Sequence, residues 1–195
     1  MRGLFFSLFV LPLLAAASFE GQTVLSDIDD MAEAPIVQTQ PRLADLLTIE
    51  SSASIFYSYA REVELSELFN EESARVTLLV PTNKAVMALA RKPHQGPAPL
   101  EDGRVISEQE YDALSKENVQ RWISAHIIPE SPIDLESRSY DTLLPGKSVE
   151  FQRIEGHSDR PDWARIVVDG EIHILRETEA INGVLYLIDG TVKID

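Results

Sequence analysis

The sequence predicts an α+β domain: a wedge or sandwich of small β-sheets with several short helices packed on one side. Three observations support this fold class. Apolar residues recur at helical spacing over residues 43–69, and a strand pattern runs directly into a helix across Pro81-Thr82-Asn83. In the last third of the chain, apolar and polar residues alternate with a period of two around turn residues such as Asp169-Gly170. Helices therefore come early and strands late.

The first 40 residues are expected to lie outside this domain. Residues 1–17 combine a positive start at Arg2 with an apolar run and an Ala-x-Ala end at Ala15 and Ala17, which is the pattern of a secretory signal peptide. An uncleaved anchor is the alternative, although the apolar run is short for a membrane span. Residues 18–40 are acidic and poor in large apolar side chains, which predicts a flexible leader. This leader is either a solvated tether or a propeptide or sorting determinant.

The domain is expected to begin near Pro41 with two or three short helices, each apolar on one face. Residues 75–80 are rich in β-branched and apolar side chains, so they predict a buried strand. This strand should end at Pro81, because proline cannot donate to a sheet ladder. Thr82 then has the character of a helix N-cap, and a helix is expected to follow as far as about Leu89.

Residues 91–106 are predicted to be an exposed insertion, because they are rich in proline and glycine. After them, Ser107-Glu-Gln-Glu110 has the form of a capping box and should open a helix through about Lys116. A second helix is predicted over residues 118–128. His126 lies on or beside the apolar face of this helix, where a packed core histidine is the usual outcome.

The last third of the chain is predicted to form strands. Asp169-Gly170 suits the tight turn of a hairpin between residues 164–168 and residues 171–175. Residues 178–182 are predicted to cross over to the next strand. The other predicted strands are residues 140–144, residues 148–154 and the closing segment 183–193.

Composition excludes several classes of function. The chain has 195 residues, of which 17 are basic and 32 acidic, and its net charge at pH 7 is −15. Such an acidic protein repels nucleic acid and anionic lipid headgroups, so no nucleic-acid partner is expected. The chain has no cysteine, and a domain of this size can fold without disulfides. It has no Asn-x-Ser/Thr glycosylation site, and no stretch after the signal peptide is predicted to span a membrane.

The sequence predicts no catalytic residue, no metal site and no cofactor. Its four histidines fall on different predicted elements without metal-ligand spacing, and it has neither a nucleophile elbow nor a glycine-rich phosphate loop. One loop contains His157, Asp159 and Asp162, which could bind a divalent ion weakly, but a solvated loop is the preferred interpretation. The alternative from another class is a lumenal hydrolase or metal-dependent enzyme, which would need His126 or His157 in a polar pocket.

Three motifs resemble those of the fasciclin domain family. Thr-Leu-Leu-Val-Pro-Thr-Asn-Lys-Ala-Val at residues 77–86 resembles the first family signature, and Asn-Gly-Val-Leu-Tyr-Leu-Ile-Asp-Gly-Thr-Val at residues 182–192 resembles the second. His126-Ile-Ile-Pro is similar to the short central histidine motif. The resemblance implies a fasciclin domain over residues 41–193, with the insertion inside it. The residues expected to stabilise the fold are Thr77, Pro81, Thr82, Asn83, Asn182, Gly183, Ile188 and Asp189.

The resemblance also implies a function and a location. Fasciclin domains are non-catalytic modules that bind proteins or glycans, and small fungal members are associated with the vacuole, some of them with autophagosome–vacuole fusion. A secreted cell-wall or cell-adhesion protein is the alternative, but the chain lacks an Arg-Gly-Asp motif, a second domain and the Tyr-His pair of integrin-binding members. The oligomeric state stays open. The predicted binding positions lie in the insertion and near the central motif: Pro93, His94, Gly96, His126, Ile127, Ile128 and Ile133.

Overall fold

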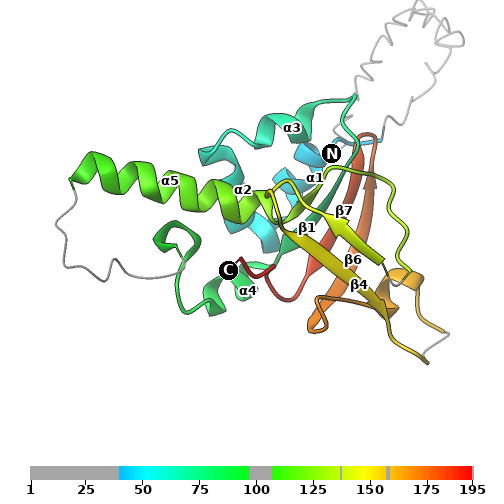
Figure 1. The fold of residues 1–195 in the computed structure, drawn as a ribbon. Helices are drawn as coiled ribbons and strands as arrows, with labels where there is room; N and C mark the ends of the chain where they lie inside the picture. Colours follow the sequence, from blue (N-terminus) through cyan, green and yellow to red (C-terminus); the bar gives the residue numbers. More distant parts are fainter. Residues whose placement is uncertain (1–39, 97–106, 137, 157–158, 195) are drawn as a thin grey trace, which may run out of the picture. The chain divides into compact units, whose positions relative to one another are not determined.

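The computed structural model describes residues 40–96, 107–136, 138–156 and 159–194, which form helices first and strands later, so the α+β prediction is confirmed (Figure 1). The predicted signal peptide, nearly all of the leader, the later part of the insertion and His157 lie outside these ranges. The helices are α1 (Leu43–Ile49), η1 (Ser51–Ala53), α2 (Ser54–Glu62), α3 (Ser66–Asn70), α4 (Asn83–Ala88), η2 (Pro93–Gln95), α5 (Glu108–Ser124) and η3 (Asp162–Arg165). The strands are β1 (Val76–Pro81), β2 (Ile127–Ile128), β3 (Arg138–Asp141), β4 (Ser148–Arg153), β5 (Ile166–Val168), β6 (Ile172–Ala180) and β7 (Gly183–Ile188). Within the described ranges, no helix combines the length and apolar character that crossing a bilayer requires.

The strands follow the spatial order β2-β1-β7-β6-β5-β4-β3. Strands β1 and β7 pair in parallel, from Val76 opposite Gly183 to Pro81 opposite Ile188. The other neighbouring strands pair antiparallel. The parallel pair therefore places the two sequence signatures side by side inside the sheet, next to its β2 edge, although they are far apart in the chain.

Both faces of β1 and β7 are covered, which is why all of their residues are buried. Successive side chains of a strand point to opposite faces. Leu78 and Leu187 accordingly belong to a cluster formed with the helices, whereas their neighbours Leu79 and Tyr186 belong to a second cluster formed with side chains of β3 to β6. The helices thus pack on one face of the central pair, and the later strands pack on the other.

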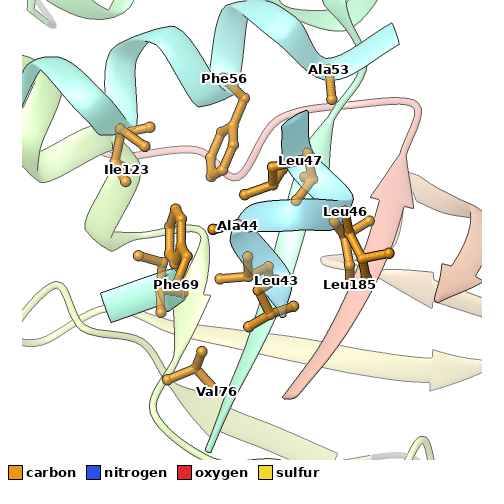
Figure 2. Close-up of a cluster of buried hydrophobic side chains, with 14 of the residues drawn as sticks. Leu43, Ala44, Leu46, Leu47, Ala53, Phe56, Phe69, Val76, Ile123 and Leu185 are labelled. Carbon is orange, nitrogen blue, oxygen red and sulfur yellow. The ribbon is translucent and has the colours of Figure 1, made fainter. Parts of the chain in front are cut away.

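Large apolar side chains from separate helices fill the first cluster. Figure 2 shows Phe56 of α2, Leu47 of α1, Phe69 of α3 and Ile123 of α5 directed into the same region. All four are at most 1% exposed. Burying a side chain of this size contributes roughly 2 kcal/mol, so the helical layer is stabilised mainly by this contact with its neighbours.

Local predictions for caps and the hairpin are confirmed. The Thr82 hydroxyl accepts a hydrogen bond from the Ala85 N–H at 3.2 Å and caps α4. Ser107 does the same for the Glu110 N–H at 3.2 Å and caps α5. Asp169 and Gly170 have φ angles of 50° and 76°, which are those of the primed turn that closes the β5–β6 hairpin.

The predicted break between two helices near Lys116 is wrong, because α5 runs without interruption to Ser124. No glycine or proline lies between these helices in the sequence, and the Asn118 side chain donates to the His94 carbonyl at 3.4 Å instead of capping a helix. The second predicted helix also ends early. His126 follows α5 in a turn, and β2 begins directly after it, because pairing with β1 satisfies backbone groups that a helix end leaves open.

Two further predictions about strands are wrong. The predicted crossover at residues 178–182 lies mostly inside β6, whose residues Thr178 and Glu179 pair with β7. The closing strand ends at Ile188, since residues 189–194 form no strand. By contrast, β1 ends at Pro81 as predicted, and the ladder tolerates proline as its last residue because proline lacks only the N–H group.

Candidate functional site

Asn182 joins the N-terminal helices to the central strands. It is fully buried, and its Oδ1 accepts a hydrogen bond from the Leu43 N–H at 2.9 Å. Its Nδ2 donates to the carbonyls of Phe69 and Glu71 at 2.9 and 3.0 Å. Only an amide offers one acceptor and two donors in this arrangement, so these contacts support the predicted role in stabilising the fold.

Asn83 makes a similar set of contacts at the start of α4. Its Oδ1 accepts from the Ile55 N–H at 2.9 Å. Its Nδ2 donates to the Ser51 carbonyl at 2.9 Å and to the Ser54 hydroxyl at 3.0 Å. The amide therefore holds the beginning of α2 against α4, and these bonds occupy the groups that a ligand would need.

The predicted binding residues of the central motif are interior. Ile127 and Ile128 are 0% and 1% exposed, and they pair with Leu78 and Thr77 of β1. The Thr77 hydroxyl donates to the Glu130 carbonyl at 2.8 Å and fixes the chain just after β2. A partner at the surface therefore does not reach the side chains of Ile127 and Ile128.

Asp189, predicted to stabilise the fold, and Ile133, predicted to bind a partner, both contact neighbouring parts of the domain. Asp189 accepts a hydrogen bond from the His173 N–H at 2.8 Å, and its other carboxylate oxygen lies 3.1 Å from Nδ1 of the same histidine. This pair joins the end of β7 to β6 at an exposed position. Ile133 is half-buried and packs against the second apolar cluster.

His126 is fully buried, and both of its ring nitrogens are hydrogen-bonded. Nε2 accepts from the Val192 N–H at 3.0 Å, so Nδ1 carries the proton and donates to the Trp122 carbonyl at 2.7 Å. Burial lowers the pKa of His126 from 6.5 to about 4; the charge of Lys147 adds to this shift, and the bond to Trp122 opposes it. The ring is therefore neutral at neutral pH, and it ties the C-terminal segment to α5.

We expect His126 alone to lower the free energy of unfolding by about 2 kcal/mol as the pH falls from about 7 to 5. The unfolded histidine titrates near 6.5 and the folded one near 4, so between these values the unfolded chain binds the extra proton. Acid therefore favours unfolding in this window. Urea unfolding at several pH values measures the effect. His126→Phe should be less stable at neutral pH but should lose this part of the slope, and an unchanged slope would contradict the assignment.

The described residues include a cavity of about 330 Å³ beside Trp122, which we call the Trp122 pocket. One wall comes from the segment between Leu89 and Gly96, and the other comes from residues 191–194. Figure 1 shows the C-terminal segment close to α4, which leads into the first wall. Since Val192 lines the pocket and donates to His126, the buried histidine positions one of its walls.

The pocket is basic although the chain is acidic. Arg91, Lys92 and Lys193 line it, and none of its described lining residues is an aspartate or a glutamate. Arg91 donates from Nε and Nη2 to the carbonyls of Gly96 and Gln95 at 2.9 and 2.7 Å, and Lys92 donates to two carbonyls near the end of α4. Neither Arg91 nor Lys92 forms an ion pair with a carboxylate in the described parts of the chain, whereas Lys193 pairs with Glu171.

The pocket includes only part of the predicted binding set. Pro93 and Gly96 line it, and His94 lies next to them, with its Nδ1 3.1 Å from the Tyr59 hydroxyl. Tyr59 in turn packs edge-on against Trp122 at a centroid distance of 5.9 Å. Sequence reasoning missed the other lining residues. The adjacent Arg91-Lys92 pair in a strongly acidic chain was the sequence feature that could have indicated the pocket. Nothing in the sequence places residues 191–194 beside this pair.

In the loop that could bind a divalent ion weakly, the carboxylate of Asp162 pairs with arginine side chains. Asp162 forms ion pairs with Arg165 and, at 3.4 Å, with Arg153. The hydrogen bond from Arg165 is the main reason that the pKa of Asp162 is lowered. His157 lies outside the described residues. Among the described residues, no three histidine or carboxylate side chains are grouped so that they could hold a metal ion.

Comparison with known proteins identifies relatives of the whole domain. The Fasciclin domain model matches residues 51–193. A FAS1 domain-containing protein of Aspergillus fumigatus is 32% identical over 148 residues, which cover 70% of this chain and 62% of the relative. One from Emericella nidulans is 28% identical, with coverage of 79% and 62%, and one from Saccharomyces cerevisiae is 27% identical, with coverage of 85% and 70%. The chain therefore spans less than two thirds of the Aspergillus and Emericella proteins.

A solved structure has the same fold. The FAS1 domain pair of the insect cell adhesion molecule Fasciclin I matches with a TM-score of 0.54 at 14% sequence identity, covering 80% of this chain and 52% of that chain. At so low an identity the likeness concerns the fold alone.

Proposed function

Because this chain belongs to the fasciclin domain family, we propose that it is a non-catalytic binding module of the secretory pathway that uses the surface around the Trp122 pocket. Proteins with this domain are generally binding or adhesion modules. The observation that carries the proposal is the lining of the pocket, whose described residues supply cations and apolar groups but no carboxylate, histidine or cysteine. Such a lining can hold a ligand through charge and apolar contact, and its described residues include no carboxylate or histidine to act as a general base. The expected partner is a protein or a glycan.

The state of His126 argues against the hydrolase alternative. A general base must be able to accept a proton from a bound substrate. The two ring nitrogens of His126 are occupied by Trp122 and Val192, and the ring has no exposed surface. It therefore supports the pocket mechanically and has no free nitrogen for proton transfer.

The proposed location is the vacuole. The signal-peptide pattern at the N-terminus supports entry into the secretory pathway. The relatives are fungal, and the resemblance to small vacuolar fasciclin proteins of fungi suggests a role in vacuole or autophagosome membrane events. A secreted cell-wall or adhesion protein is the second candidate, because proteins with this domain include adhesion modules.

A fluorescent tag placed after Asp195 tests the location in a fungal host. We expect the signal in the vacuolar lumen or at its membrane, with the mature protein beginning near Ser18. A Leu13→Arg control should block entry, because it places a charge in the apolar run of the signal. Signal in the wall or medium would replace the vacuolar proposal with the adhesion one, and cytosolic protein that retains Met1 would overturn the proposed compartment.

A further inference from the structure

We propose that the Trp122 pocket binds a small anionic amphiphile: a molecule with a carboxylate headgroup and one short apolar tail. This inference rests on the proposed binding function and names a ligand class for the same surface. Three properties of the pocket support it, namely its apolar lining, the positive charge of Arg91 and Lys92, and the indole N–H of Trp122, which can donate to a ligand.

The lining is apolar and its volume is small. Leu89, Pro93, Trp122, Val192 and Ile194 contribute to it. Its volume of about 330 Å³ is near the lower end of the range for small-molecule sites, roughly 300–1,000 Å³. The pocket therefore suits a single short chain or one ring and is too small for a lipid with two long tails.

The charge of the pocket selects an anion. The chain carries 32 acidic and 17 basic residues, yet within the described ranges the pocket is lined by three basic residues, of which only Lys193 pairs with a carboxylate, and by no acidic one. Arg91 and Lys92 are half-buried, and their bonds to neutral carbonyls position them without cancelling their charge. A partly desolvated cation attracts an anion more strongly than an exposed one does, because the local dielectric is lower.

Trp122 supplies the third property. It is only 3% exposed, and its indole N–H has no hydrogen-bond partner among the residues that the structure describes. Among the described residues, Nε of Arg165 is the only fully buried side-chain nitrogen or oxygen without a partner, so the indole N–H of Trp122 is open to water or to a ligand in the pocket. An oxygen atom of a ligand could accept a hydrogen bond from this N–H, and the neighbouring cations favour an oxygen that carries negative charge.

Octanoate is a suitable probe, and its charge can be varied while the tail is kept. The chain has two tryptophans, so in a Trp163→Phe background the fluorescence comes from Trp122 alone. We expect a saturable change in emission with octanoate up to about 20 mM, since so small a ligand binds in the millimolar range. Octanol should bind about fivefold more weakly, and octylammonium should not bind. Amide NMR shifts of Val192 and Ile194 should move in the same titration.

Lys92→Gln tests the charge while keeping a donor for the helix carbonyls. It should weaken octanoate binding about fivefold and leave octanol binding unchanged. Lys84→Gln is the matched control, because Lys84 is an exposed lysine that does not line the pocket, and it should have no effect. Unchanged thermal unfolding of both variants would show that they remain folded.

Several outcomes would overturn the inference. These are the absence of a saturable response, equal affinity for octanoate, octanol and octylammonium, or shifts that leave Val192 and Ile194 unmoved. Any of them would leave the proposed location and the protein or glycan partner intact, because the tagged-protein experiment does not depend on the pocket. Conversely, octanoate binding by a protein found in the cytosol would support the pocket and overturn the proposed compartment.

Discussion

Replacing Asn182 by aspartate is expected to lower the free energy of unfolding by about 4 kcal/mol. The side-chain amide donates to the carbonyls of Phe69 and Glu71, and its oxygen accepts from Leu43. Aspartate would direct a second oxygen, and a negative charge, at two carbonyl oxygens inside the core. The bonds that join α1 and α3 to the central strands would be lost, so the helical layer should loosen first.

Denaturant unfolding of Asn182→Asp and of Asn70→Asp measures this effect against a matched change. Asn70 is exposed, and its only side-chain hydrogen bond in the described chain is a long one of 3.5 Å to the Ser66 carbonyl. We expect the control to lose at most about 1 kcal/mol. Similar losses in both variants would contradict the central role that the structure gives to Asn182.

Replacing Gly183 by alanine is expected to destabilise the domain by at least about 3 kcal/mol, or to prevent folding. A Cβ atom at this position would lie 1.9 Å from the Val76 carbonyl oxygen, which is far inside van der Waals contact. Val76 and Gly183 face each other at the start of the parallel β1–β7 ladder. Because the clash is with backbone, it can be relieved only by moving the central strands apart.

Gly146→Ala is the matched control for this substitution. A Cβ atom at Gly146 would meet nothing within 4 Å, so only its φ of 78° opposes alanine, at a cost of about 1 kcal/mol. Circular dichroism and denaturant unfolding of the two variants separate the clash from the general cost of losing a glycine. Equal stability of the two alanine variants would show that β1 and β7 can adjust at this point.

These contacts give a physical reason for the signature residues. The asparagines of both signatures bind backbone groups of the helices, and the Gly183 position allows β7 to lie against β1. The signatures therefore describe how the two halves of the domain are joined. Thr191 and Val192 of the second signature also line the Trp122 pocket, but Asn83, Asn182 and Gly183 do not. Substitutions of Asn83, Asn182 or Gly183 should therefore affect stability, and substitutions of Arg91 or Lys92 should affect binding.

Local patterns in the sequence were sufficient to predict the fold class and several element boundaries. The Thr82 and Ser107 caps and the Asp169-Gly170 turn depend on hydrogen bonds and φ angles within a few residues. Such features can be recognised in the chain because the interacting groups are neighbours in sequence. The alternation of apolar residues similarly indicates which elements are strands.

Patterns of this kind did not predict the path of the chain around His126. Its apolar neighbours Ile127 and Ile128 fit a helical pattern, but pairing with Leu78 and Thr77 makes them a strand. A short apolar run is compatible with either structure, and the outcome depends on which backbone groups lie nearby. The same pairing buries side chains that had been expected near a binding surface.

The sequence by itself determined the fold class, the caps, the hairpin turn and the acidic character of the chain, because each of these follows from nearby residues or from composition. Only the tertiary structure decided where the Trp122 pocket lies. Its walls come from residues 89–96 and 191–194, and its floor includes Trp122. They meet because His126 binds the Val192 N–H and because β7 pairs with β1, and neither contact leaves a trace in local sequence.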